Sequence, residues 1–215
     1  MIELDLRPGW VDPELAEEFP ELSLTSALVE ARPRRSPPAL KDQLRALADR
    51  YTGAKVVQMR QDQVPWAYRV FARQVGVDPD TDRTPVEAIA LARLRHGGLR
   101  SENIVDDALT IAVAETGVPV VALDAARLEG EPGLRPSLPG ERLGPLRPLS
   151  SRQIVIADAA RPLAVVLGKV SEHAGVTAKT ERMLLCALGV KGVPRISIEE
   201  ALWLAGETLY TGAGA

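Results

Sequence analysis

The chain has 215 residues, of which 46% are apolar and 26% are charged. A chain of this length buries roughly 70% of the surface that its unfolded form exposes, so it needs no metal or cross-link to fold. A single cysteine, Cys186, excludes an internal disulfide framework and a multi-thiolate zinc site. No secretory signal is visible, and no apolar run approaches the roughly 18 residues of a membrane span. We expect a cytosolic protein without cofactor, metal or membrane contact.

Charge is distributed unevenly along the chain, whose net charge is −3. Residues 1–30 carry one Arg and eight acids, whereas residues 31–100 carry twelve Arg and two Lys against seven acids. A basic block inside an acidic protein can serve a phosphate-bearing partner. The alternative is a solvated helix surface in an arginine-rich protein, since Arg outnumbers Lys by 21 to 5.

The first 60 residues predict two strands separated by a short helix and followed by a longer helix. Asp12 before Pro13 has the form of an N-cap with proline at the first helical position. In chain order, the expected elements are a strand over 2–6, a helix from Pro13 through Phe19, a strand over 22–29, a stiff proline-rich linker over 33–38 and a helix over 40–51 that Gly53 closes.

Three helices are expected in the basic and central part of the chain, over 66–75, 84–96 and 104–116. Thr84 and Glu87, on either side of Pro85, form a capping box that opens the second helix. Asn103 caps the third helix and Gly117 ends it. The predicted core face of the first helix consists of Trp66, Val70, Phe71 and Val75, with Arg69 and Arg73 pointing elsewhere.

From residue 119 the pattern changes to short β-rich runs between Gly and Pro. The predicted strands lie over 119–123, 153–157, 163–167 and 182–188, the middle two as a hairpin. A capping box from Ser197 to Glu200 opens a last helix through Tyr210, which Leu202, Trp203 and Leu209 anchor, and residues 211–215 are expected to be disordered. Helices followed by strands, without βαβ alternation, predict an α+β fold with a mixed or antiparallel sheet and flanking helices.

Few side chains follow a catalytic pattern. The sequence contains neither a glycine-rich phosphate-binding motif nor a serine nucleophile elbow. His96 stands at a predicted helix end, where the dipole favours a cation, and two histidines are too few for a histidine metal site. His173 lies in a polar segment after a β-run, which fits either a site edge or a solvated turn. Cys186 lies in an apolar run and fits a buried core thiol better than a nucleophile.

The order of several motifs is more specific than any one of them. The chain carries, in sequence, Ser101-Glu102-Asn103-Ile104-Val105-Asp106, then Gly117-Val118-Pro119, then Ala122-Leu123-Asp124. This order resembles the core of the B3/B4 domain, the tRNA-binding and editing module of the phenylalanyl-tRNA synthetase β subunit. Further similar segments lie at 83–85, 97–99, 153–158, 162–168 and 176–185.

The resemblance covers about residues 64–190 and implies a single B3/B4-like domain over residues 1–210. Residues 1–60 would add an N-terminal strand–helix–strand extension and a helix, and residues 197–210 a closing helix. The chain resembles the free-standing versions of this domain, which have no aminoacylation module.

The resemblance also implies a substrate pocket. In the synthetase, the domain hydrolyses the ester that joins a wrong amino acid, tyrosine, to tRNA. The family's polar pocket positions fall here on Ala108, Leu109, Val121 and Cys186, and Gly168 matches a scaffold glycine. Ester hydrolysis needs a positioned water and oxyanion donors, and selecting tyrosine needs a polar partner for its hydroxyl. An apolar lining supplies neither, although backbone amides near Gly168 could act as donors.

The leading hypothesis is a module that binds tRNA or aminoacyl-tRNA. Binding alone and hydrolysis both stay open; an enzyme of this kind would be an aminoacyl-tRNA ester hydrolase. The polar candidates for the hydrolytic step, just after a β-run, are Lys169, Ser171 and His173. Guanidinium groups pair bidentately with phosphate, and the expected RNA contacts are Arg83, Arg93, Arg95 and Arg100.

The alternative is a non-catalytic domain that kept the fold and lost RNA binding. Such a domain would bind a small molecule or another protein. The apolar pocket positions and the acidic balance of the whole chain favour it, and a fold does not fix a function.

Overall fold

The computed structural model describes residues 3–145 and 148–212. The helices are α1 (Pro13–Glu18), α2 (Pro38–Arg50), α3 (Gly53–Gln58), α4 (Gln63–Gln74), α5 (Pro85–His96), α6 (Ile104–Thr116) and α7 (Arg195–Thr211). The strands are β1 (Leu6–Pro8), β2 (Trp10–Val11), β3 (Ser23–Glu30), β4 (Val120–Asp124), β5 (Gly133–Pro136), β6 (Ile154–Ala157), β7 (Pro162–Val165) and β8 (Arg182–Gly189). Two 3₁₀ turns, η1 (Met59–Gln61) and η2 (Ala125–Arg127), complete the list.

The strands form two four-stranded sheets. The first has the order β1-β3-β8-β4 and is antiparallel throughout. The second has the order β2-β5-β6-β7 and is mixed, because β2 and β5 run parallel. The predicted hairpin of β6 and β7 is present. The α+β class, with antiparallel and mixed sheets and flanking helices, is confirmed.

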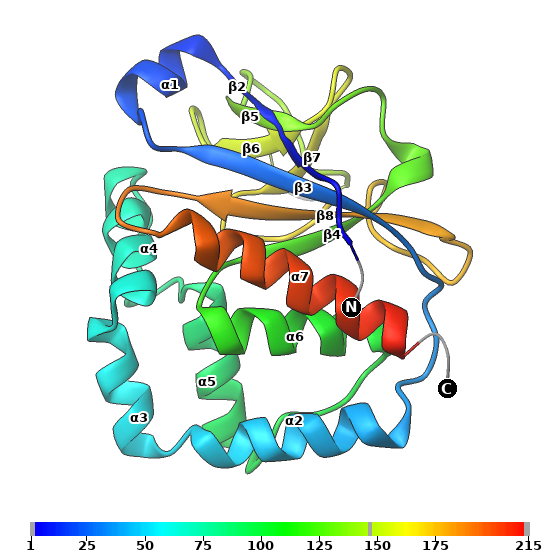
Figure 1. The fold of residues 1–215 in the computed structure, drawn as a ribbon. Helices are drawn as coiled ribbons and strands as arrows, with labels where there is room; N and C mark the ends of the chain where they lie inside the picture. The colour runs from blue at the N-terminus through cyan, green and yellow to red at the C-terminus, as the bar shows by residue number, and fades with distance from the viewer. Residues whose placement is uncertain (1–2, 146–147, 213–215) are drawn as a thin grey trace.

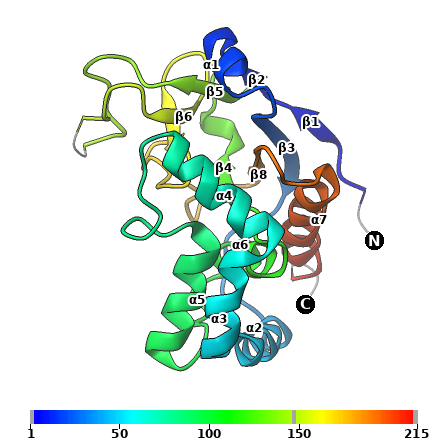
Figure 2. The same ribbon diagram turned by 90° about the vertical axis from the view of Figure 1, so that its left-hand side faces the viewer.

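Most helices lie at the opposite end of the molecule from the sheets, although α1 lies beside β2 and β5 (Figures 1 and 2). Figures 1 and 2 show both sheets at one end, α2, α3 and α5 at the other, and α6 and α7 between them. Helix α7 packs against α6 on one side and against β3 and β8 on the other. The fully buried Leu202 and Leu209 lie on α7, as predicted, whereas Trp203 is only half-buried.

Local signals fix most helix ends. The Asp12 carboxylate accepts hydrogen bonds from the amides of Glu14 and Leu15, as an N-cap does. The capping box of Thr84 and Glu87 is present at the start of α5. Helix α6 has the predicted bounds, with the Asn103 side chain capping its first turn and Gly117, at φ 76°, ending it.

Other local predictions are wrong. The first strand lies at Leu6–Pro8 rather than over 2–6, and Ile2 is outside the described residues. Gly53 begins α3 instead of closing α2, which ends at Arg50. The last helix begins at Arg195, after Pro194, so Ser197 lies inside it and caps nothing. Of the C-terminal residues expected to be disordered, Thr211 ends α7, and 213–215 are outside the described residues.

The core face of α4 also differs from the prediction. Trp66 and Val70 are exposed, whereas Arg69, expected on the solvent side, is buried. Phe71 is buried as predicted and packs edge-to-face against Phe19. The buried face of α4 instead contains Ala67, Tyr68, Phe71 and Ala72, about one residue away from the predicted face, and Arg69 is buried beside it in an ion pair with Glu87.

Candidate functional site

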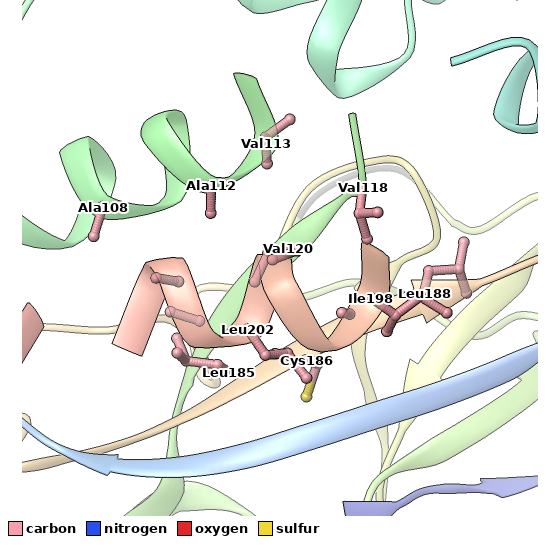
Figure 3. Packing of buried hydrophobic residues seen from close by; sticks show 14 of the residues in the cluster. Ala108, Ala112, Val113, Val118, Val120, Leu185, Cys186, Leu188, Ile198 and Leu202 are labelled. Carbon is pink, nitrogen blue, oxygen red and sulfur yellow. The ribbon is translucent and has the colours of Figure 1, made fainter. Parts of the chain in front are cut away.

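The residues predicted to line an apolar pocket are divided between two places. Ala108 and Cys186 are core residues, with exposed fractions of 0% and 1%. Val121 and Cys186 are directly opposite in the β4–β8 register, and Leu109 packs against the core from α6. Figure 3 shows Ala108 on α6 and Cys186 on β8 among apolar side chains. Burial raises the pKa of the Cys186 thiol to about 12, so this thiol is a core group.

Gly168 lies apart from that core, in the exposed turn that follows β7. This turn forms one wall of a cavity of about 730 Å³, which we call the α5–β7 cavity. The loop before α5 and the first turns of α5 contribute a second part of the lining, and Leu143, Pro148, Leu149 and Gln153 contribute the rest. Its lining includes Thr81, Arg83, Leu149, Val166, Gly168 and Lys169.

The α5–β7 cavity combines apolar walls with a few polar groups. Leu149, Val165 and Val166 provide apolar surface, and the charged residues of the lining are the cations Arg83 and Lys169 and the carboxylate Asp82. Cavities of about 300–1,000 Å³ with this composition suit a small ligand or one nucleoside-sized group. The structure thus brings together three of the residues predicted from sequence, namely Arg83, Gly168 and Lys169.

Ser171 and His173 lie in a turn beyond Lys169 and do not line the α5–β7 cavity. The Ser171 hydroxyl lies 3.3 Å from Nε2 of His173 and accepts a hydrogen bond from the Ala174 amide. Ser171 is buried, so its hydroxyl stabilises the turn rather than facing a ligand. His173 is partly exposed, and burial together with Arg161 lowers the pKa of its imidazole. Its ring is therefore neutral at pH 7.

The four arginines predicted to bind RNA lie at both ends of α5. Arg83 precedes the helix at the cavity, whereas Arg93, Arg95 and Arg100 lie in or after its last turn. A helix of 12 residues is about 18 Å long, so these arginines do not form one patch. The guanidinium of Arg93 donates to the Ala48 carbonyl oxygen at 2.8 Å, while Arg95 and Arg100 are exposed.

The sequence analysis missed an ion-pair network at the N-terminal end of α5. Its buried part is the pair of Arg69 and Glu87, with 2.6 Å between Nη1 and Oε1. The other Glu87 oxygen accepts from the amide and hydroxyl of Thr84, so the capping box and the ion pair share one carboxylate. The capping box was visible as a spacing, but its arginine partner lies 18 residues away, on another helix.

Residues 3–145 and 148–212 hold neither a three-residue metal-ligand cluster nor a membrane-spanning helix. In that part of the chain, no group of three His, Cys, Asp or Glu side chains could hold a metal ion. None of its helices combines the length and the apolar character that crossing a membrane requires.

The comparisons with known proteins agree with the motif order. The family model "B3/4 domain" matches residues 67–199, which is more than half of the chain. The chain is 35% identical over 107 residues to the phenylalanine–tRNA ligase β subunit of Chromobacterium violaceum, covering 47% of this chain and 13% of that protein. It is 38% identical over 102 residues to the same subunit of Dickeya dadantii, covering 44% of this chain and 13% of that protein.

Each of these matches covers only a small part of the relative's length. A third relative, the same subunit of Legionella pneumophila strain Paris, is 39% identical over 77 residues, which are 34% of this chain and 10% of that protein. The chain thus spans only about an eighth of the length of these relatives. The match over residues 67–199 establishes that this protein belongs to the B3/4 domain family, the domain that it shares with phenylalanine–tRNA ligase β subunits.

Proposed function

We propose that this protein binds tRNA or the end of an aminoacyl-tRNA, with the terminal nucleoside or its amino acid in the α5–β7 cavity. The observation that carries the proposal is the cavity itself, which has apolar walls and the two cations Arg83 and Lys169 against one carboxylate, Asp82. Membership of a family shared with tRNA ligase subunits supports RNA as the partner. An apolar wall suits a base or a side chain, and a cation at the edge suits the adjoining phosphate.

The geometry supports binding better than hydrolysis. The Gly168 amide, a possible oxyanion donor, already donates to the Val165 carbonyl oxygen at 2.9 Å. Of the predicted catalytic candidates, Lys169 lines the cavity, whereas Ser171 and His173 lie in the turn beyond it, so the three side chains do not face the cavity together. Ester hydrolysis in trans is therefore a separate part of the proposal and has its own test.

Binding is tested by a mobility-shift titration with unfractionated tRNA at several salt concentrations. We expect a shift that weakens as salt rises, because phosphate contacts release counterions. The variant Lys169→Ala should weaken binding, and Lys179→Ala, an exposed lysine of the next turn, is the matched control. A shift that is indifferent to salt, or none at all, contradicts the proposal.

Hydrolysis is tested with a panel of mischarged tRNAs, following release of the amino acid. Release that depends on Lys169 would make the protein a deacylase. A shift without release across the panel would leave a binding module.

The second candidate function is a small-molecule-binding or protein-interaction domain. A specific observation favours it: the positions where the family has polar pocket groups are apolar here, and Ala108 and Cys186 are closed within the core. The ultraviolet absorbance ratio of the purified protein discriminates between the two. A ratio typical of protein alone, together with no tRNA shift, would favour this candidate.

A further inference from the structure

Asp80, in the loop before α5, is surrounded by arginines from three segments. Its carboxylate oxygens lie 2.7 Å from Nη2 of Arg69, 3.3 Å from Nη2 of Arg73, 3.5 Å from Nη1 of Arg83 and 3.8 Å from Nη1 of Arg60. The side chain of Asp80 is 52% exposed, so this convergence takes place at the surface. One carboxylate cannot satisfy four guanidinium groups, each of which carries five N–H donors.

Counting Asp78 and Asp82 of the same loop and Glu87 of α5, the four arginines and four acids of this region balance in charge, but the other acids are not bonded to the arginines in the way that Asp80 is. Glu87 is buried and committed to Arg69, Arg60 and Thr84. The Asp78 carboxylate accepts from the Asp80 amide and from the Thr81 hydroxyl, within its own loop. Asp82 lines the α5–β7 cavity. Around Asp80 itself, four guanidinium groups therefore face two carboxylates.

Three of the four arginines keep donors available to solvent. The exposed fractions of the side chains are 38% for Arg60, 46% for Arg73 and 30% for Arg83, whereas Arg69 is buried. Arg83 also lines the α5–β7 cavity, so the arginines and the cavity form one continuous surface. A tetrahedral anion with several oxygens matches such a set of converging guanidinium donors.

We propose that Arg60, Arg73 and Arg83 form a phosphate-binding site beside the α5–β7 cavity, which takes a backbone phosphate of the bound RNA, with Asp80 as an internal competitor for the same donors. The identity of the phosphate as part of an RNA rests on the proposed function; the site itself rests only on the cluster. The arginines at the far end of α5 are not part of it.

The test is tRNA binding by the full chain, measured by fluorescence anisotropy, with variants of exposed, ion-paired side chains. The double variant Arg60→Gln/Arg73→Gln should weaken binding about tenfold and reduce the salt slope by about 1, because one phosphate contact is lost. The matched control, Arg45→Gln/Arg195→Gln, removes the same charge from exposed ion pairs on α2 and α7 and should change binding less than threefold. Equal losses in both double variants would overturn the site.

Asp80→Asn provides a test of opposite sign. Because it removes the competing charge, it should tighten tRNA binding about threefold. A merely structural role of Asp80 predicts lower stability without tighter binding, and that result would overturn the competitor role.

A second probe separates this inference from the proposed function. Inorganic pyrophosphate should raise the melting temperature of the wild-type protein and should do so much less in Arg60→Gln/Arg73→Gln. If tRNA does not bind but pyrophosphate stabilises through these arginines, the proposed function fails and the phosphate site stands. If pyrophosphate does not stabilise the protein, and tRNA binding does not depend on Arg60 and Arg73, the phosphate site is wrong and the proposed function stands.

Discussion

Two regions hold most of the residues for which the sequence predicted function, and they differ in access and charge. The region between α6 and β8, with Ala108 and Cys186, is apolar and closed to solvent. The region between the start of α5 and the turn after β7 is hollow and carries Arg83 and Lys169. In the first, side chains fill the space at the aligned pocket positions; in the second, three separate segments leave space between them.

The difference between the two regions shows that a resemblance in sequence does not predict whether a side chain is exposed. The resemblance predicts a pocket position at Cys186, but the exposure of a side chain depends on the volumes of its neighbours, and Cys186 is buried. The apolar side chains of Ala108, Val121 and Cys186 are consistent with core packing, which disfavours an unpaired polar group. We therefore expect a ligand at the α5–β7 cavity, whose lining is charged and open, and not in the closed region.

The largest expected effect comes from introducing an acid into the closed region. Cys186→Glu should destabilise the protein by about 4 kcal/mol or more, because it buries a carboxyl group without a partner and overpacks the core. Urea unfolding measures it, with Cys186→Ala as the control at about 1 kcal/mol. If Cys186→Glu were as stable as the wild type, this region would be an open pocket, and the contrast between a closed and an open region would be wrong.

The next effect concerns the charged region. Arg69→Ala should cost about 3 kcal/mol, because it leaves the buried Glu87 with the more exposed Arg60 as its remaining cation. Arg73→Ala, on the same helix and also paired with Asp80, should cost less than about 1 kcal/mol because it is half exposed. Thermal unfolding of both variants gives the comparison. Equal losses of stability in the two variants would mean that burial does not determine how much each arginine's ion pairs stabilise the protein.

The smallest effect is the pH dependence due to His173. Burial and Arg161 lower the pKa of His173 in the folded protein, although Asp158 opposes this. The unfolded chain therefore binds more protons as the pH falls below the ordinary value of 6.5, and folding stability decreases in that range. His173→Gln should reduce the stability difference between pH 8 and pH 5.5, measured by urea unfolding. An unchanged difference would show that His173 titrates as an exposed histidine.

The sequence predicted the elements whose ends depend on neighbouring residues. Thr84 with Glu87, and Asn103 with Gly117, act within one or two turns, so their spacing was sufficient. The burial of Arg69 depends on Glu87 from another helix, and no spacing rule indicates such a partner. The α5–β7 cavity is formed by three separate parts of the chain. The sequence therefore indicated Arg83, Gly168 and Lys169 one by one, but it did not predict that they lie close together.

Strand β3 lies between β1 and β8 and pairs with β8 over all eight of its residues, from Ser23 opposite Gly189 to Glu30 opposite Arg182. The segment recognised as the family domain begins at residue 67, well after this strand. A fragment cut at that boundary would expose one full side of β8, with its amides and carbonyls free to pair with other molecules. We expect such a fragment to aggregate, so recombinant work on this protein should retain its first thirty residues.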